Sequence, residues 1–493
     1  MTSVLHVCSE VYPLLKTGGL ADVAAALPPA LIRLGHDARI LVPAYPSVRA
    51  GVVGLRHVTS VAPRFGADAI DLYLGAMPDS GAPVYLIDAP TLYDRSGDPY
   101  SNADRQPYAD NCQRFALLGW MAAQLALGLD AGWKPQVIHG HDWHAGLAPA
   151  YLHAARIATS QPLAASVFTV HNLAYQGLFA REAFNGLDLP PEFFAVDGAE
   201  FHSQLSFLKA GLFYADKIST VSPSYAREIL DADQGCGLEG LLRSRSAAGD
   251  LAGILNGVDP AVWSPASDPF ITSFYSTRAM AGKLLNKVAL QREHGLAEQD
   301  DKPLFCVVSR MTEQKGLKLV LTGIAELIQR GGQLMVLGSG DAAMEAEFLA
   351  AAARHPQSVA VQIGYDEEKS HRIIAGSDVV MVPSRFEPCG LTQLYGLRYG
   401  SLPLVRRIGG LGDSVTDCAL ENIADGVASG FVFDEFNESA FLAALRRAFA
   451  LFARKRDWNL VQKYAMKQEF SWESAARHYL ALYDQALKMV LRH

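Results

Sequence analysis

Residues 383–400, PSRFEPCGLTQLYGLRYG, carry side chains that could act on an anionic or sugar ligand. Arg385, Glu387 and Cys389 follow the apolar run VVMV, which is typical of a buried strand, and the apolar spacing after Gly390 predicts a helix. Open α/β sheets bind ligands in such loops, where the free N–H groups of the helix favour a phosphate. The segment alone is equally compatible with a solvated loop that carries one exposed carboxylate.

A second candidate is the tetrapeptide Lys16-Thr17-Gly18-Gly19, which follows an apolar run at residues 4–8. Adjacent glycines let the backbone approach a ligand closely and expose N–H groups, and Lys16 adds a cation. The spacing matches neither a GxGxxG fingerprint nor a Walker A loop. By itself the tetrapeptide is more typical of a tight turn with a surface lysine.

Polar clusters also follow two further apolar runs. The first is HGHDWH at residues 139–144, and the second is His171-Asn172. Three histidines and an aspartate within six residues raise a metal hypothesis. It is disfavoured because a strand end and a turn would point these side chains in different directions, and no distant cysteine or glutamate completes a site. The sequence therefore predicts no metal site and a ligand-facing Asp142, while His171 alone fits a structural histidine.

The elements that must position these residues alternate along the chain, which predicts doubly wound parallel sheets. Predicted strands span residues 4–8, 38–42, 84–87, 137–139, 166–170, 217–221, 251–255, 304–308, 334–337, 359–363, 379–382 and 403–405. Predicted helices span residues 20–31, 112–127, 145–156, 201–215, 317–328 and 472–490. A turn at Asn256-Gly257 and the prolines after it mark a domain boundary. We predict domains at 1–257 and 258–467, with a C-terminal helical segment at 468–493 that packs back across both.

Successive predicted strands of the second half end in loops rich in charge or glycine. These loops contain Arg310 and Lys315, then Gly338, Gly340 and Asp341, then Tyr365, then Glu387, and finally Gly409-Gly410. Because parallel strands end at one edge of a sheet, the loops should converge, which is less expected by chance than any single loop. Two α/β domains whose ligand edges face a central cleft suit a reaction between two substrates. Arg310 and Lys315 can neutralise a leaving diphosphate without a metal, which indicates group transfer from a nucleotide-activated donor.

Composition limits the partners and the compartment. Of 493 residues, 50% are hydrophobic, and the formal net charge of −8 argues against nucleic acid or an anionic membrane as the main partner, although not against a carbohydrate. Six scattered cysteines fit reduced thiols in a cytoplasm. Neither a secretory signal nor an apolar run of the roughly 18 residues that a membrane span needs is present. The sequence leaves the oligomeric state open.

Six motifs together resemble the bacterial glycogen synthase family, from end to end. They are KTGGLADV at 16–23, HDWHAGL at 141–147, FTVHNLAYQG at 168–177, ILNGVD at 254–259, SRMTEQKG at 309–316 and PSRFEPCGLTQLYGLRYG at 383–400. The resemblance implies a GT-B fold, ADP-glucose as donor, and extension of glycogen or another α-1,4-glucan with retention at the anomeric carbon. It implies no metal and no cofactor. Ile408 and Gly412 stand where the family would have threonine and alanine, which puts no role in doubt.

The resemblance also implies roles for individual residues. Lys16, Gly18 and Gly19 should contact the phosphates and glucose of the donor, and Arg310 and Lys315 should hold the diphosphate. His171 should place its carbonyl near the anomeric carbon and its ring near the glucose. Glu387 should bind glucose hydroxyls, and the backbone of Cys389, Gly390 and Leu391 should contact the same sugar. Further candidates near the donor or acceptor are Asp22, Asp142, Asn172 and Asn256, with Tyr365 at the adenine.

Two mechanisms and three other protein classes remain to be weighed. Retention through double displacement needs a carboxylate nucleophile beneath the sugar ring. The resemblance favours front-face attack instead, with Glu387 as a sugar ligand. A non-catalytic glucan-binding relative is disfavoured because Lys16, Arg310, Lys315 and Glu387 are all present. The sequence lacks the GxGxxG fingerprint of a nicotinamide oxidoreductase and the pyridoxal-phosphate lysine motif of a phosphorylase, so both classes are disfavoured.

Overall fold

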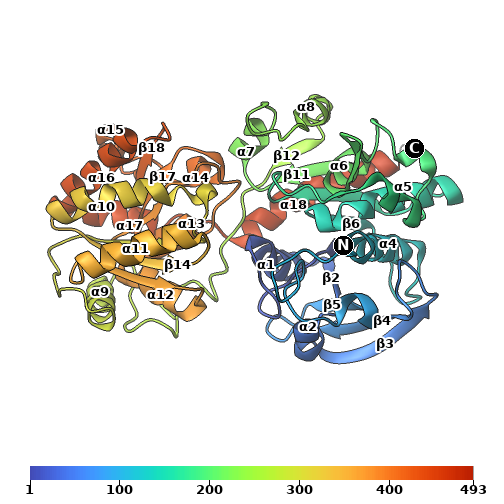
Figure 1. The fold of residues 1–493 in the computed structure, drawn as a ribbon, viewed down its shortest axis with the longest axis horizontal. Helices are drawn as coiled ribbons and strands as arrows, with labels where there is room; N and C mark the ends of the chain where they lie inside the picture. The colour runs from blue at the N-terminus through green and yellow to red at the C-terminus, as the bar shows by residue number, and fades with distance from the viewer. Residues whose placement is uncertain (492–493) are drawn as a thin grey trace. The chain divides into compact units, whose positions relative to one another are not determined.

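The computed structural model describes residues 1–491 as two compact α/β units (Figure 1). The first unit contains Met1–Ile254 and the segment from Trp472 onward, and the second contains Leu255–Ser471. The predicted divisions, after residues 257 and 467, lie near these two points. Near the points where the chain enters and leaves the second unit, Val258 N donates to Phe470 O over 2.7 Å, so the first and last segments of this unit lie side by side.

The sheet of the first unit has nine strands. In spatial order they are β12 (Leu251–Gly253), β11 (Lys217–Thr220), β7 (Ala165–Val170), β6 (Val137–His141), β1 (Ser3–Val7), β2 (Asp37–Pro43), β5 (Pro83–Asp88), β4 (Ile70–Ala76) and β3 (Val53–Val61). The strands from β12 to β5 pair in parallel, as predicted. The antiparallel pairs of β5, β4 and β3 were not predicted.

Helices cover both faces of this sheet, because side chains alternate along each buried strand. Val4 of β1 packs in a cluster with α1 (Gly19–Arg33) and α18 (Trp472–Val490), whereas Leu5 packs on the opposite face with residues of α4 (Asn111–Leu127). The C-terminal helix α18 belongs to the first unit, where it contacts α1, β7 and β11. The other helices of this unit are α2 (Pro46–Gly51), α3 (Pro90–Tyr93), α5 (Leu147–Thr159), α6 (Phe207–Tyr214), α7 (Pro223–Glu228) and α8 (Glu239–Ala247).

The sheet of the second unit is parallel throughout. Its spatial order is β15 (Val359–Ile363), β14 (Gln333–Gly338), β13 (Leu304–Val308), β16 (Val379–Val382), β17 (Leu402–Arg406) and β18 (Phe431–Phe433). Counted along the chain within this unit, that order is 3-2-1-4-5-6, the doubly wound arrangement of dinucleotide-binding folds. Its helices are α9 (Ala281–Glu293), α10 (Leu317–Gln329), α11 (Ala342–Arg354), α12 (Glu367–Gly376), α13 (Thr392–Tyr399), α14 (Gly409–Ser414), α15 (Leu420–Ala424), α16 (Glu438–Ala453) and α17 (Lys455–Ala465).

Two predicted helix starts are wrong. The helix predicted from residue 201 begins at Phe207, where the Ser206 hydroxyl accepts from Lys209 N over 3.1 Å. The residues before it form β9 (Glu200–Phe201) and β10 (Gln204–Ser206), and β10 pairs with both β9 and β8 (Leu178–Phe179). The helix predicted from Gly390 begins at Thr392, because Gly390 has a φ of +73°, which a right-handed helix excludes.

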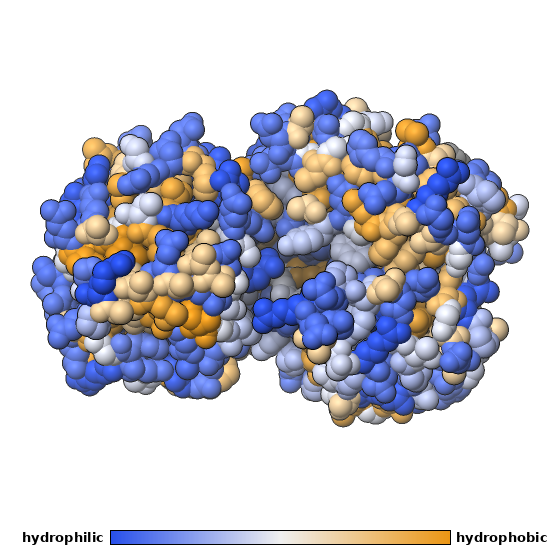
Figure 2. All heavy atoms as spheres, in the orientation of Figure 1, coloured by the Kyte–Doolittle hydropathy of each residue, from blue (hydrophilic) through white to orange (hydrophobic). Residues whose placement is uncertain are grey.

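The surface in Figure 2 mixes hydrophilic and hydrophobic residues over the visible face of each unit. Within residues 1–491, every helix is too short or too polar to cross a membrane. The helix predicted at residues 112–127 corresponds to α4, most of whose side chains are buried.

Candidate active site

The strand order of the second unit reverses between β13 and β16, which run side by side although β14 and β15 lie between them in sequence. Ligands of doubly wound sheets bind at this point, beyond the carboxyl ends of the strands. The two loops that leave these strands are residues 309–316 and 383–391. Between them they carry Arg310 and Lys315, predicted to hold the diphosphate, and Glu387, predicted to bind the glucose.

Lys315 and Glu387 form an ion pair at this point. The Lys315 ammonium donates to Glu387 Oε2 over 2.6 Å, and the Ser384 hydroxyl donates to the same oxygen over 2.9 Å. Glu387 and Ser384 are buried, whereas Lys315 is partly exposed. No bond to Glu387 Oε1 is described for residues 1–491, so one carboxylate oxygen is fixed and the other remains able to accept from a ligand.

Arg310 differs from Lys315 although both lie in one loop. Its side chain is exposed, and the part of the chain that the structure describes gives it no ion pair. A guanidinium keeps its charge at any pH of interest and matches phosphate oxygens in a two-pronged geometry. Arg310 can therefore bind an anion without first breaking a contact within the protein.

The two loops are held together along their backbones. Arg385 N donates to Gln314 O over 2.8 Å, and the Gln314 amide donates to Phe386 O over 3.3 Å. Gly316 allows this approach, because a Cβ at that position would lie 2.0 Å from Pro383 O and its φ is +66°. Glycine at 316 thus sets the spacing between the Lys315 and Glu387 loops.

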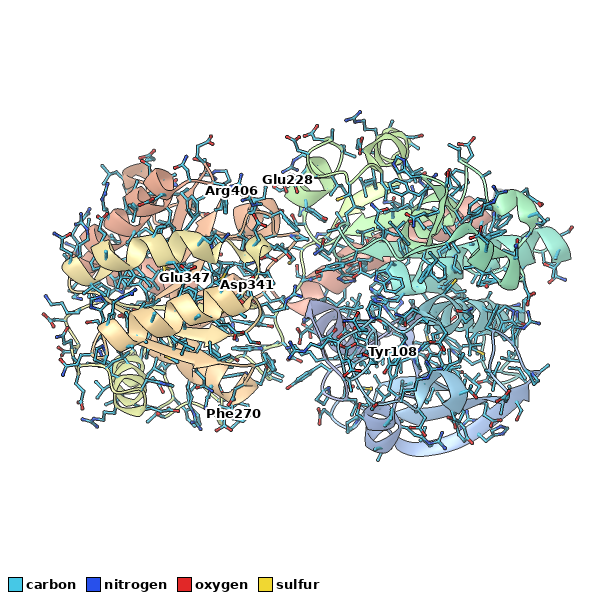
Figure 3. All side chains as sticks on the ribbon, in the orientation of Figure 1. Tyr108, Glu228, Phe270, Asp341, Glu347 and Arg406 are labelled. Atoms are coloured by element: carbon cyan, nitrogen blue, oxygen red, sulfur yellow. The ribbon has the colours of Figure 1, made fainter. Side chains whose placement is uncertain are left out.

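A third loop supports the Glu387 loop from the other side. A Cβ on Gly409 would lie 2.0 Å from Glu387 O, and one on Gly410 would lie 2.2 Å from Cys389 O. Arg406, at the end of β17 and labelled in Figure 3, donates to Arg385 O over 2.5 Å. The predicted row of glycine-rich loops therefore includes one loop that packs directly against the candidate sugar-binding backbone.

Cys389 and Asn256 lie next to this backbone. Burial raises the pKa of the Cys389 thiol to about 12, so the side chain is a neutral thiol rather than a nucleophile. The Cys389 sulfur accepts from the backbone N–H of Asn256, which belongs to the second unit although the predicted boundary put it in the first. Asn256 Oδ1 is buried and lacks a hydrogen-bond partner within residues 1–491, which makes it a further candidate acceptor.

The other predicted residues of this unit lie nearby in sequence or on a neighbouring strand end. Gly390 and Leu391 lead into α13, and Tyr395 N donates to Leu391 O over 2.9 Å. Tyr365 follows β15 and is exposed, and its hydroxyl donates to Glu367. Asp341, labelled in Figure 3, accepts from Met344 N and so begins α11. Tyr365 is thus an accessible ring, and Asp341 is a helix cap.

The sheet of the first unit also has a point where the strand order reverses, between β1 and β6. The loop after β1 carries Lys16, Gly18 and Gly19. The Lys16 ammonium lies 3.0 Å from Asp22 Oδ1, so two predicted residues form an ion pair. Gly18 precedes α1, and a Cβ there would meet nothing within 4 Å, which leaves its backbone open to a ligand.

Glu10, which the sequence did not single out, shapes this loop. Its buried carboxylate accepts from Thr17 N over 2.5 Å, from the Thr17 hydroxyl over 2.8 Å and from Gly18 N over 3.3 Å. Its second oxygen accepts from the Tyr100 hydroxyl over 2.9 Å. Burial raises the pKa of Glu10, although these hydrogen bonds oppose the shift. The only sequence signal was a charged residue at the start of the loop that follows a buried strand.

Asp142 orients the segment that follows β7. Asp142 Oδ1 accepts from His171 N over 2.8 Å and from Asn172 N over 3.3 Å. Burial raises the pKa of Asp142 to about 7, and its φ of +56° is unusual for a residue other than glycine. Asn172 Oδ1 accepts in turn from Ala174 N over 3.1 Å, which closes a turn. Asp142 was predicted to face a ligand, whereas the contacts of its Oδ1 place the backbone of His171.

The histidines of residues 139–144 do not all diverge as predicted. His139 and His141 lie on one face of β6 because strand side chains repeat every second residue, and their ring centroids are 4.1 Å apart. Ring nitrogens of these two residues and of His6 lie within 4.8 Å of one another. Both nitrogens of His139 already contact hydroxyls, those of Tyr483 at 2.8 Å and Thr169 at 2.6 Å. His144 lies apart and stacks on Tyr100.

Comparisons with known proteins agree with this arrangement. A family model described as the starch synthase catalytic domain matches residues 3–244, and one described as glycosyl transferases group 1 matches residues 291–459. A glycogen synthase from Francisella tularensis subsp. novicida is 56% identical over 486 residues, which cover 98% of this chain and 99% of that protein. One from Francisella philomiragia subsp. philomiragia is 57% identical over 483 residues, with the same coverage of both chains.

The chain belongs to the glycogen synthase family. Among solved structures, the catalytic domain of starch synthase IV from Arabidopsis thaliana bound to ADP and acarbose superposes with a TM-score of 0.89. That chain is 32% identical, and the match covers 99% of both chains. The predicted family and the GT-B fold are confirmed. As a glycogen synthase homologue, the protein is a glucosyltransferase that uses a nucleotide-sugar donor and a glucan acceptor.

Proposed function

We propose that the protein transfers glucose from ADP-glucose to the non-reducing end of an α-1,4-glucan, with retention at the anomeric carbon and without a metal or other cofactor. The observation that carries the choice of nucleotide is the likeness along the whole chain to a starch synthase bound to ADP. The cationic loops at the reversal point of the second sheet support a diphosphate leaving group.

Arg310 and Lys315 hold the diphosphate in this proposal. The transfer places developing negative charge on the departing ADP, and two cations beside it stabilise that charge in the way a metal ion would. The exposed guanidinium of Arg310 binds first, and Lys315 is already fixed by its ion pair with Glu387. Tyr365, an exposed ring at the end of β15, stacks on the adenine.

Glu387 binds the glucose of the donor. Its Oε2 is occupied by Lys315 and Ser384, and its Oε1 accepts from a sugar hydroxyl. The backbone of Cys389, Gly390 and Leu391 contacts the same sugar. The ion pair with Lys315 and the hydrogen bond from Ser384 stabilise the negative charge of the whole carboxylate and so lower its nucleophilicity, which supports front-face attack over double displacement. In this route the acceptor hydroxyl enters beside the departing diphosphate, and the diphosphate takes its proton.

Residues of the first unit also contact the donor in this proposal. Lys16, Gly18 and Gly19 contact the phosphates and the glucose, with Asp22 holding Lys16 in place. The carbonyl of His171 stabilises positive charge at the anomeric carbon. Asp142 and Asn172 maintain the backbone there, and Asn256 in the second unit contributes its buried amide oxygen.

Incorporation of labelled glucose into glycogen, from ADP-glucose and separately from UDP-glucose, tests the proposed activity. We expect incorporation from ADP-glucose at a rate well above that from UDP-glucose. The anomeric proton couplings of the product report whether the new linkage is α. A β linkage would refute retention, and no incorporation from either donor would refute the enzyme assignment.

The role of Glu387 has its own test with a matched control. Glu387→Gln should reduce kcat by about 100-fold or more while raising the Kd for ADP-glucose much less, because the loss falls on charge stabilised in the transition state. Glu313→Gln, an exposed carboxylate in the neighbouring loop, should change neither value appreciably. Isolation of a covalent glucosyl adduct on Glu387 would overturn the front-face route.

A further inference from the structure

Three histidine side chains form a continuous chain of ring contacts across the first unit. His6 lies in β1 and His141 in β6, and His171 follows β7, so this histidine chain crosses three adjacent strands. His6 Nδ1 lies 3.1 Å from His141 Nε2, and His141 Nδ1 lies 3.1 Å from His171 Nε2. His6 and His141 are fully buried and His171 is partly exposed, so the histidine chain leads from the core of the first unit to its surface.

All three rings are neutral near neutral pH. Burial lowers the pKa of His6 and of His171 to about 3, and it lowers the pKa of His141 well below its ordinary value. A neutral imidazole carries one N–H and one lone pair. Each of the two contacts therefore needs one proton between its nitrogens, and the single proton of His141 can serve only one of them. The N–H groups in the two contacts must consequently point the same way along the histidine chain.

Only two arrangements satisfy this condition. In the outward arrangement His6 donates to His141, His141 donates to His171 Nε2, and the proton of His171 lies on Nδ1. In the inward arrangement His171 donates to His141, and Nδ1 of His171 carries a lone pair. The partner-free atom at the inner end distinguishes them, because His6 Nε2 is buried without a hydrogen-bond partner among the described residues. The inward arrangement would put an orphaned N–H there, and such groups are rarer in proteins than unsatisfied acceptors.

We propose that His141, supported by His6, is a positioning residue that fixes the tautomer of His171, so that His171 presents Nδ1–H as a hydrogen-bond donor to a substrate oxygen. The inference rests on the proposed function for the contact between His171 and the donor sugar. Asp142 fixes the backbone of His171, and His141 fixes its ring, so the two residues together leave His171 little freedom. A substrate hydroxyl or phosphate oxygen then meets a donor already oriented, without reorganisation of the site.

A metal ion held by His6, His139 and His141 is the competing explanation for this cluster, because the ring nitrogens lie within 4.8 Å of one another. Both nitrogens of His139 are, however, occupied by the hydroxyls of Tyr483 and Thr169. A bound metal would also take the lone pairs that the ring contacts need. Elemental analysis of the purified full-length protein decides between the two, and a stoichiometric transition metal that stays bound in a chelator would overturn the proposal.

Nitrogen NMR of the full-length protein labelled with ¹⁵N-histidine tests the tautomer directly, since protonated and unprotonated ring nitrogens have distinct shifts. The His171 signals are assigned by their loss in His171→Asn. We expect wild-type His171 to be protonated at Nδ1 and unprotonated at Nε2. The opposite pattern would refute the proposal. Because this readout needs no turnover, it stands or falls separately from the ADP-glucose assay.

Paired variants then separate positioning from packing. In His141→Asn the side-chain N–H group can take the place of Nδ1 and donate to His171, whereas His141→Leu cannot donate. We expect His141→Leu to mix the tautomers of His171 and to lower kcat by about ten-fold, the equivalent of one ordinary hydrogen bond. His141→Asn should restore the wild-type nitrogen pattern and most of the rate. His144→Phe replaces a buried histidine that is not part of the histidine chain, and it should leave the His171 signals unchanged. Unchanged His171 signals in His141→Leu would refute the positioning role.

Discussion

The Asp142 carboxyl, which positions the backbone of His171, is expected to lower the free energy of unfolding above neutral pH. Burial raises its pKa from 3.8 to about 7, so folding favours the protonated carboxyl. A group with a raised pKa contributes stability that is fully present below pH 3.8 and is lost as the pH rises to about 7. That interval corresponds to about 4 kcal/mol in the free energy of unfolding.

Asp142→Asn should remove this loss. The amide oxygen can accept from His171 N and Asn172 N as the carboxylate does, and asparagine tolerates the φ of +56°. The variant should match the wild type at the acid end of the interval and become more stable as the pH rises. The gain above pH 7 should approach about 4 kcal/mol, reduced by whatever the lost charge contributed to the two hydrogen bonds.

Asp142→Ala is the matched control, and it should destabilise the first unit at acid pH, where Asp142→Asn matches the wild type. It leaves two backbone N–H groups without their acceptor and places alanine at a positive φ, for a loss of about 3 kcal/mol or more below pH 3.8. Because alanine also removes the titrating carboxyl, this loss should shrink as the pH rises, and at every pH the variant should remain less stable than Asp142→Asn. Amide hydrogen exchange of peptides from β6 and β7 measures both effects in the first unit alone, which matters because two units need not unfold together. An Asn variant that is no more stable at high pH, or whose gain does not change with pH, would refute the reasoning.

Three further predictions concern the loops. Glu10→Gln should lower glucose incorporation by about ten-fold, because the N–H groups of the Thr17 loop lose a charged acceptor, and an unchanged rate would contradict this role. Tyr365→Ala should raise the KM for ADP-glucose by roughly five-fold, the loss of about 1 kcal/mol of stacking, with kcat retained; a fall in kcat alone would count against adenine stacking. Gly316→Ala should destabilise the second unit by about 2 kcal/mol or more in denaturant unfolding, since its Cβ would meet Pro383 O at 2.0 Å; an unaltered midpoint would show that the loops can separate freely.

Buried parallel strands were the easiest elements to predict from the sequence. Residues 304–308, 359–363 and 379–382 were predicted with the bounds that β13, β15 and β16 have, and residues 472–490 with those of α18. A strand covered on both faces is apolar throughout, and a helix covered on one face repeats its apolar residues regularly. The antiparallel strand β3 lacks such a run, because most of its side chains are exposed or partly exposed. Its pairing with β4 therefore left no clear pattern in the sequence.

The supporting residues of the site were harder to find than the ligand-facing ones. Lys315 and Glu387 could be found as charged residues in the loops that follow apolar runs, and the strand order brings these loops together. His6 lies within β1 and Glu10 lies in the loop that follows it, but their importance comes from partners far away in sequence, His141 and Tyr100. A buried polar group is identified by what satisfies it, and only the tertiary structure supplies that partner.

The charges of the second unit divide into a group that fixes geometry and a group that attracts the donor. Lys315 and Glu387 neutralise each other at 2.6 Å, so at long range the pair adds little net attraction for a diphosphate, although the Lys315 ammonium has further N–H groups that can donate to phosphate oxygens at contact. Their closeness instead fixes one carboxylate oxygen and one ammonium in a partly buried place, where either charge alone would be costly. Arg310 is exposed and its charge is not offset by an ion pair in the described part of the chain, so the net positive charge of the two loops at this point comes from it. Removing the Arg310 charge should therefore weaken donor binding, and added salt should weaken donor binding by the wild type in the same way. Removing Lys315 should instead disorder the sugar-binding carboxylate of Glu387.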